Sequence, residues 1–380
     1  MCSQMSRITG YDHARRLDAL RTALDAHGLA GAVLSRPEHV FYFSGTMPGP
    51  SPVFLIVLPQ RLAAVAPSWL RLGDWETLTY TDYDIQNGWD VSQGAASALK
   101  RALAGGDRRT ASVRAGQAVG LELSHLPAVF LAAVREATGE PQDIADLLWQ
   151  LRRIKDADEI AQIAANVAGN DQVFAALQEA LQPGMAEIDL WAVAYRALCD
   201  VAGGPVVLEA DMGAGPRASN PDARPTCERL VPGDAVLVDL YSATRGYYAD
   251  TTRVFVLGQP DGKQRHVHGI LASALAAGQA LLRPGVLACE VDAAVRGVIE
   301  RAGYGPRFPH HSGHAYGLFQ QERPYLIPAE RTPLEAGMVV TLEPGIYLPG
   351  WGGMRLEGNY AIIETGARRL DRFPSELIVC

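Results

Sequence analysis

The sequence predicts a two-domain chain, with a small α/β domain in residues 1–152 followed by an α+β domain in residues 153–380. Three observations support this division. The length of 380 residues exceeds what one hydrophobic core usually serves. Apolar strand-like runs alternate with helical periodicity up to about residue 150. Beyond that point, helices are mixed with glycine-punctuated strands of mostly antiparallel character.

The first domain begins with a predicted helix over residues 12–28, in which three leucines recur at helical spacing. Residues 31–45 and 51–59 are predicted as strands broken by turns, and residues 84–103 and 124–139 as helices. A long amphipathic stretch over residues 147–184 crosses the domain boundary and ends at a Pro-Gly pair. The second domain continues with predicted helices over 186–204, 262–282 and 287–303, and with strand-rich segments over 204–213, 236–255 and 337–366.

Composition excludes several classes of protein. The net charge of −8 argues against a nucleic-acid binder, which usually carries a basic patch. Apolar runs fall far short of the roughly 18 residues that a membrane span needs. The first ten residues lack a signal-peptide pattern, and five cysteines without ligand spacing suit a reducing compartment. We therefore expect a cytoplasmic protein that binds neither membranes nor nucleic acids.

Two carboxylates lie eleven residues apart in VDLYSATRGYYADTTR, residues 238–253. The flanks are strand-like, and a hairpin centred between Thr244 and Arg245 would place Asp239 directly opposite Asp250. Opposed side chains have β-carbons about 5 Å apart, so two like charges would repel each other unless one is protonated or a cation is bound. The alternative is a pair of exposed loop acids.

A second pair of acids repeats the pattern near the C-terminus. Glu343 and Glu357 are 14 residues apart and symmetric about Gly350, inside the turn-rich LPGWGG. A hairpin centred there would bring these two carboxylates together, although exposed strand-end acids would give the same spacing.

Histidines gather in PHHSGHAYG, which contains His310, His311 and His314. Gly313 and Gly317 flank His314 and allow close approach of backbone and ligand. Four carboxylates and one imidazole form an oxygen-rich donor set. It suits two divalent ions such as Mn²⁺, Co²⁺ or Zn²⁺ better than a structural zinc site. Two such ions favour metal-assisted hydrolysis.

In this order and with these neighbours, the motifs resemble those of the pita-bread metallopeptidases, a family that includes prolidase and aminopeptidase P. The matching phrases are DTTR from Asp250, GHAYG around His314, EPGIY from Glu343 and RLE ending at Glu357. The resemblance covers nearly the whole chain. It implies a C-terminal pita-bread domain, preceded by a smaller α/β domain of the creatinase type.

The resemblance also implies roles for the five residues. Asp239 would be the bidentate ligand of one metal, while Asp250 and Glu357 would bridge both metals. His314 and Glu343 would complete the other metal. Glu343 would also take the proton from the nucleophilic water and pass it to the leaving amine.

Two positions depart from the family pattern. Gln321 stands where a second histidine is usual, seven residues after His314. It keeps an N–H donor but cannot carry charge or transfer a proton. A histidine usual some fifteen to twenty residues before Asp239 is also absent, and Arg224 lies closest to that place.

Other residues are candidates for the substrate side. Arg224, Arg323 and Arg355 are candidates for gripping a substrate carboxylate, and the resemblance gives Arg355 the alternative role of supporting the metal ligands. His310 matches a substrate-side histidine of aminopeptidase P-like members. For His311 we expect a structural role.

The leading functional hypothesis is an Xaa-Pro dipeptidase with two divalent ions, which the resemblance implies is a homodimer. The alternatives are an aminopeptidase P that acts on longer Xaa-Pro peptides and a divergent member that acts on a small non-peptide. A non-catalytic binding module that retains the fold is the alternative from another class.

Overall fold

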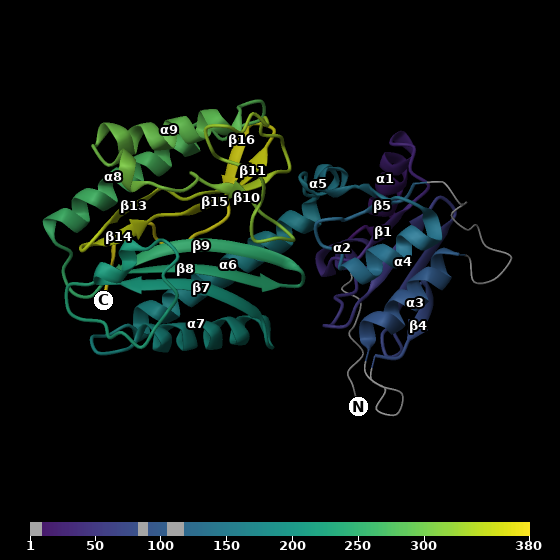
Figure 1. The fold of residues 1–380 in the computed structure, drawn as a ribbon. Coiled ribbons are helices and arrows are strands. Elements are labelled where there is room, and N and C mark those ends of the chain that lie inside the picture. The colour runs from purple at the N-terminus through teal and green to yellow at the C-terminus, as the bar shows by residue number, and fades with distance from the viewer. Residues whose placement is uncertain (1–9, 83–89, 105–117) are drawn as a thin grey trace. The chain divides into compact units, whose positions relative to one another are not determined.

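The computed structural model describes residues 10–82, 90–104 and 118–380 (Figure 1). The chain separates into two compact units, Met1–Arg152 and Arg153–Cys380. Each unit has its own sheets and its own hydrophobic clusters.

The first unit contains a six-stranded mixed sheet in the order β4-β3-β2-β1-β5-β6. Its strands are β1 (Ala32–Leu34), β2 (Phe54–Leu58), β3 (Arg61–Pro67), β4 (Glu76–Tyr80), β5 (Gly120–Leu121) and β6 (Gln142–Asp143). Its helices are α1 (His13–Ala26), α2 (Pro37–Ser44), α3 (Val91–Leu103), α4 (Ala128–Thr138) and α5 (Ala145–Arg152). Alternate residues of β2, Phe54 and Ile56, join the core that α3 and α4 form over the sheet.

Most predicted elements of this unit are confirmed, but the segment over residues 31–45 is not two strands. It forms the short strand β1 and then helix α2. Pro37 occupies the first turn of this helix, where its missing N–H is not needed, and Gly45 ends it in the left-handed conformation with φ of 73°. The apolar run that suggested a strand is therefore part of a helix in which every residue from His39 to Ser44 is buried. Residues 84–89 of the predicted helix over 84–103 lie outside the described residues.

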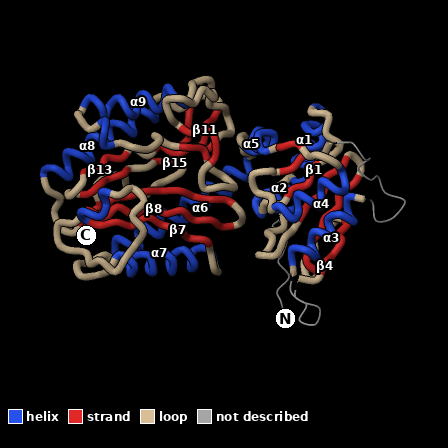
Figure 2. The backbone as a smooth tube through the Cα atoms, viewed as in Figure 1, coloured by secondary structure: helices blue, strands red, loops and turns tan. Residues whose placement is uncertain are grey.

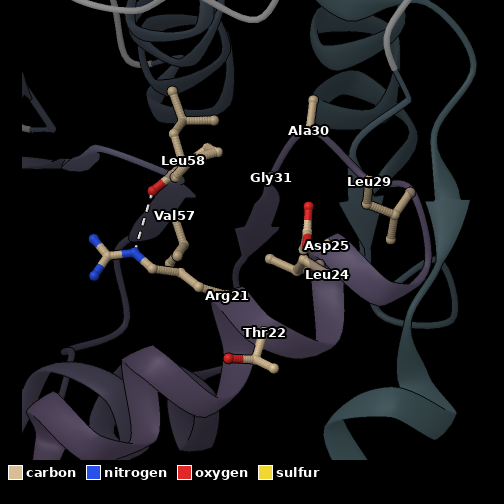
Figure 3. Close-up of a pocket in the computed structure, with 10 residues that line it drawn as sticks. Arg21, Thr22, Leu24, Asp25, Leu29, Ala30, Gly31, Val57 and Leu58 are labelled. Atoms are coloured by element: carbon tan, nitrogen blue, oxygen red, sulfur yellow. Dashed lines mark hydrogen bonds between the residues drawn. The ribbon is translucent and has the colours of Figure 1, made fainter.

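A cavity of about 270 Å³ lies between α1, the segment of residues 29–31 that follows it, and the end of β2 (Figure 3). Figure 3 shows the Arg21 side chain turned toward the carbonyl of Leu58, to which its Nε donates at 3.3 Å. The lining is mainly apolar, and none of the predicted site residues contributes to it.

The second unit contains three sheets and four α-helices among its described residues (Figure 2). The helices are α6 (Ala157–Ala180), α7 (Glu187–Ala202), α8 (Gly262–Gln279) and α9 (Ala288–Arg301), with 3₁₀ turns at Gly215–Ser219 and Gly305–Arg307. The four-stranded sheet, β17-β9-β8-β7, consists of β7 (Val207–Ala214), β8 (Ala235–Thr244), β9 (Tyr247–Val256) and β17 (Ile378–Val379).

The five-stranded sheet has the order β11-β10-β12-β15-β16, and β13 pairs with β14 separately. The strands are β10 (His314–Ala315), β11 (Glu322–Tyr325), β12 (Val339–Leu342), β13 (Gly345–Leu348), β14 (Gly352–Arg355), β15 (Gly358–Ile363) and β16 (Gly366–Arg369).

Two helix pairs cover the sheets on opposite sides of this unit (Figure 1). Helices α6 and α7 pack on β7, β8 and β9 through one hydrophobic cluster. Helices α8 and α9 pack on β12 to β15 through another. Because side chains alternate along a strand, the β8 residues Val236, Val238 and Leu240 face α6 and α7, while Asp239 points the other way, between the helix layers.

The long amphipathic stretch over residues 147–184 is not continuous, because it divides into α5 and α6. Asp156 caps the start of α6 by accepting a hydrogen bond from the backbone N–H of Glu159, and the Glu159 carboxylate accepts from the N–H of Asp156. This capping box starts a new helix within the predicted one.

Every helix in the described ranges is too short or too polar to cross a lipid bilayer.

A buried ion pair joins Lys155, the residue before the N-cap of α6, to β11. Lys155 Nζ lies 3.0 Å from Glu322 Oε2, and both side chains are 2% exposed. We predict that Lys155→Met destabilises the protein by about 3–5 kcal/mol, because it leaves a buried carboxylate without its cation. Urea unfolding measures the change. Arg196→Ala, which breaks an exposed pair with Asp200, is the control and should leave the midpoint unchanged. An unchanged midpoint for Lys155→Met would contradict the prediction.

Candidate metal centre

The hairpin of β8 and β9 presents Asp239 and Asp250 on one face, but its predicted register is wrong. Asp239 pairs with Thr252, and Tyr241 pairs with Asp250. The turn consists of Arg245 and Gly246, with left-handed φ values of 48° and 83°, so its centre lies one residue later than predicted. The two acids are therefore diagonal neighbours rather than directly opposed. They stay on the same face because each residue of β8 pairs with a residue of β9 two positions later than predicted. Two positions is the period with which side chains return to the same face of a strand.

The predicted register of the second hairpin is confirmed. Gly345 pairs with Arg355 in β13 and β14, and Leu342 pairs with Gly358 in β12 and β15. Both pairs are symmetric about Gly350. Glu343 and Glu357 therefore face each other at the junction between these two ladders.

The structure brings all five predicted metal ligands together. Carboxylate oxygens of Asp239, Asp250 and Glu357 lie within 4.8 Å of one another, and all three residues are buried. His314 Nε2 lies 3.4 Å from Asp250 Oδ2 and 3.3 Å from Glu343 Oε1. Residues from two different sheets thus meet in one cluster.

In Asp239 and in Glu357, one carboxylate oxygen accepts hydrogen bonds from protein donors, and the other oxygen does not. Asp239 Oδ2 accepts from Arg355 Nη2 and contacts the Tyr241 hydroxyl, and Glu357 Oε2 accepts from Thr252 Oγ1 at 2.9 Å. Asp239 Oδ1 and Glu357 Oε1 are buried without a hydrogen-bond partner among the described residues. A buried carboxylate oxygen without a partner is costly, and a cation would satisfy both oxygens.

The tautomer of His314 points to the same conclusion. Its Nδ1–H donates to the carbonyl of Ala315 at 2.9 Å, which leaves a lone pair on Nε2. That lone pair faces the carboxylates of Asp250 and Glu343. Three electron-rich atoms aimed at one point repel one another without a cation, and the arrangement is the one that a metal-binding histidine needs.

Burial and mutual repulsion perturb the acids of the cluster. Burial raises the pKa of Asp250 and of Glu357 well above the usual range, and the charges of neighbouring carboxylates raise both pKa values further. Burial also acts to raise the pKa of Glu343, but the nearby His311, His314 and His310 outweigh burial and lower that pKa to about 2.

Arg355 is deeply buried in this centre. Besides Asp239, its guanidinium donates to Thr252 Oγ1 at 3.0 Å and to the Tyr347 hydroxyl at 2.9 Å. Arg355 therefore links Asp239 to Thr252 and Tyr347 within the protein.

The other residues expected on the substrate side lie farther out. Arg224 is 61% exposed, and its Nε lies 3.5 Å from Asp211 Oδ1. Arg323 is exposed and lies 3.8 Å from Glu330, and Gln321 is exposed just before β11.

The two remaining histidines differ in their contacts. His310 hydrogen-bonds to the Tyr347 hydroxyl and to the carbonyl of His311. The His311 ring, for which we expected only a structural role, lies with Nδ1 3.4 Å from Glu343 Oε1.

Sequence reasoning missed several residues of this centre. Tyr241 follows Asp239 at the strand period and Thr252 lies within the DTTR phrase, so both could have been found by extending the face of each strand. Asp211, whose Oδ2 lies 3.0 Å from the Tyr241 hydroxyl oxygen, gave no signal because its place depends on the pairing of β7 with β8.

Comparisons with known proteins agree with this geometry. The creatinase/prolidase N-terminal domain matches residues 16–154, and metallopeptidase family M24 matches residues 161–364. A probable dipeptidase PepE from Mycobacterium tuberculosis is 31% identical over 97% of this chain and 96% of its own length. An Xaa-Pro dipeptidase from Pyrococcus furiosus is 29% identical over 96% of this chain and 99% of its own length.

Solved structures give the same result. A prolidase from Thermococcus sibiricus superposes with a TM-score of 0.86 at 28% identity, covering 98% of this chain and 100% of that one. The dipeptidase PepE from Mycobacterium ulcerans superposes with a TM-score of 0.82 at 31% identity, covering 98% of this chain and 99% of that one. The predicted pita-bread domain with a creatinase-type N-terminal domain is thereby confirmed. The chain belongs to metallopeptidase family M24.

Proposed function

We propose that this protein is an Xaa-Pro dipeptidase that uses two divalent metal ions. The observation that carries the proposal is the convergence of four carboxylates and the Nε2 lone pair of His314, with two buried oxygens unpartnered. Relatives named Xaa-Pro dipeptidase match nearly the full length of the chain and support the substrate class.

Asp239, Asp250, His314, Glu343 and Glu357 would hold the ions. When bound, two divalent ions supply a nucleophilic water of lowered pKa and stabilise negative charge on the scissile carbonyl oxygen. The donor set of carboxylate oxygens and one imidazole is compatible with Mn²⁺, Co²⁺ or Zn²⁺.

Glu343 is the residue suited to move the proton. Its carboxylate can accept a proton from the attacking water and pass it to the leaving proline nitrogen. Thr341 Oγ1 donates to Glu343 Oε1 at 3.0 Å and orients the carboxylate for this task.

We propose that the protein acts in the cytoplasm, because its free cysteines suit a reducing compartment. We also propose that it is a homodimer. Cys199, Cys227, Cys289 and Cys380 are all free thiols. The family resemblance supports the dimer.

An aminopeptidase P that cleaves longer Xaa-Pro peptides is the second candidate, and the same metal centre would serve it. A member acting on a small non-peptide is favoured only by Gln321 and by the lack of a histidine near Arg224.

The substrate panel tests the proposal directly. Chelator-treated protein supplied with Mn²⁺, Co²⁺ or Zn²⁺ should release proline from Xaa-Pro dipeptides and should lose this activity when chelator is added again. Cleavage of Xaa-Pro-Yaa tripeptides in preference to dipeptides would establish the aminopeptidase. Metal-loaded protein that cleaves neither class would contradict a peptidase function.

The buried acids predict an unusual stability signature. Without metal, Asp250→Asn should melt at a higher temperature than the wild type, because it removes one of the mutually repelling carboxylates. The wild type should gain stability on metal addition, by about 2.7 kcal/mol at one hundred times the dissociation constant, while the variant gains little. Differential scanning calorimetry measures both effects. Exposed Glu364→Gln is the control and should behave like the wild type. Equal metal-induced shifts in Asp250→Asn and wild type would exclude Asp250 as a ligand.

The two arginines near Asp239 should respond differently to substitution. Arg355→Met should weaken metal binding about 10- to 100-fold, because it releases Asp239 from its orienting donor. Arg224→Ala should leave metal content unchanged and raise the KM for dipeptides if its exposed guanidinium grips the substrate carboxylate. Elemental analysis after dialysis, together with steady-state kinetics, separates these effects. Unchanged metal content in Arg355→Met would refute its supporting role.

A further inference from the structure

Both ring nitrogens of His310 are already engaged within the protein. Arg355 Nη1 donates to the Tyr347 hydroxyl oxygen at 2.9 Å. The hydroxyl hydrogen is then free to donate to His310 Nε2, which lies 2.9 Å away. His310 Nδ1–H donates in turn to the carbonyl of His311 at 2.8 Å. These directions make His310 a neutral imidazole with no donor left for a substrate.

The burial of His310 agrees with this assignment. Burial lowers the pKa of His310 to about 4, with Arg355 and His311 also acting to lower it against the opposing effect of Glu343. A neutral ring that is fully hydrogen-bonded serves as a brace for Tyr347 and for the loop that follows.

The His311 ring has the opposite character. Its Nδ1 is buried and has no hydrogen-bond partner among the described residues. That nitrogen lies 3.4 Å from Glu343 Oε1, the same oxygen that His314 Nε2 approaches at 3.3 Å. The side chain is 19% exposed, so it lies at the open edge of the cluster rather than in the core.

The backbone around His311 is held from both sides, which fixes the point from which its side chain leaves the main chain. Arg296 donates to the carbonyls of Phe308 and His310 at 3.1 and 2.9 Å, and forms an ion pair with Asp292. Ser312 Oγ donates to Asp292 Oδ1 at 2.6 Å. The carbonyl of Ser312 accepts from the N–H of Glu343 at 2.9 Å, so the loop and the metal-side acid are tied together.

A buried ring nitrogen without a partner costs roughly 1–3 kcal/mol, and a ligand that supplies the partner recovers this free energy. A lone pair on Nδ1 would face the Glu343 carboxylate, so the favourable tautomer carries its hydrogen on Nδ1. The contact with Glu343 is too long for a good hydrogen bond, and that hydrogen stays available to an oxygen atom that enters the site.

We infer that His311, rather than His310 or Gln321, donates a hydrogen bond from Nδ1 to an oxygen of the bound substrate. This inference rests on the proposed function, because the acceptor is the carbonyl oxygen of the Xaa-Pro bond, on which negative charge develops. A preorganised donor at that oxygen stabilises the transition state more than the ground state. Exposed Gln321 is then not required for this donor role.

Asparagine and glutamine distinguish the two ring nitrogens. The side-chain amide of asparagine reaches the position of Nδ1, and that of glutamine reaches the position of Nε2. We expect His311→Ala to lower kcat/KM for Ala-Pro by about 10²–10³, mainly through kcat, with bound metal unchanged. His311→Asn should recover at least tenfold over His311→Ala, whereas His311→Gln should not. Exposed His266→Asn on α8 is the matched control and should retain full activity.

A second readout does not depend on turnover. The phosphinic analogue of Ala-Pro, whose tetrahedral oxygens imitate the transition state, should bind His311→Ala more weakly than wild type by a similar factor in calorimetry. Melting curves and elemental analysis of each variant confirm folding and metal content.

Three results would overturn the inference while the wild type still cleaves Ala-Pro. The first is full activity in His311→Ala. The second is loss of metal from His311→Ala, because that would make His311 a metal ligand. The third is equal recovery of activity in His311→Gln and His311→Asn. A metal-loaded wild type that neither cleaves Ala-Pro nor binds the analogue would overturn the proposed function and this inference with it.

Discussion

Mutual repulsion among four carboxylates gathered around one imidazole is the constraint on which the rest of this structure depends. Asp239, Asp250 and Glu357 bring their oxygens within 4.8 Å of one another, inside a layer covered by helices. In that environment desolvation and like charge oppose the ionised forms of Asp250 and Glu357. Such a cluster is stable only when its negative charge is offset, by protons or by metal cations. The unpartnered oxygens and the His314 lone pair favour cations.

A second set of residues determines which oxygens remain available for metal. Arg355 and Tyr241 donate hydrogen bonds to Oδ2 of Asp239, and Thr252 donates one to Oε2 of Glu357. Each carboxylate is thereby fixed in rotation and presents one oxygen to the centre. Orienting contacts of this kind are what allow a site to bind metal without rearranging its ligands.

The three histidines of one short loop have three different environments. His314 offers a lone pair to the carboxylates, His310 is fully hydrogen-bonded as a brace, and His311 keeps an unpartnered nitrogen near Glu343. The loop backbone is anchored through Asp292 and Arg296, so these differences arise from fixed ring directions and not from residue type. A chain that lacks the usual histidine at position 321 thus has another imidazole within reach of the same centre.

The sequence by itself determined the residue types, the face of each strand and the family. Asp239 and Asp250 lie on the same face whenever the pairing of the two strands is shifted by an even number of residues. The two acids therefore share a face although the predicted register is wrong. The symmetric spacing of Glu343 and Glu357 likewise predicted their pairing, because a turn relates residues at equal distances from its centre.

Only the tertiary structure decided which of the candidate residues meet. The contact of Arg355 with Asp239 joins two sheets across 116 residues of sequence, and no local pattern encodes it. The same holds for Asp211 opposite Asp239, and for the exposure of Arg323 and Gln321. The periodicity of apolar residues in the sequence indicates which way a side chain points from its own strand or helix. Which residue that side chain contacts depends on how separate elements pack, and this packing is a property of the folded chain.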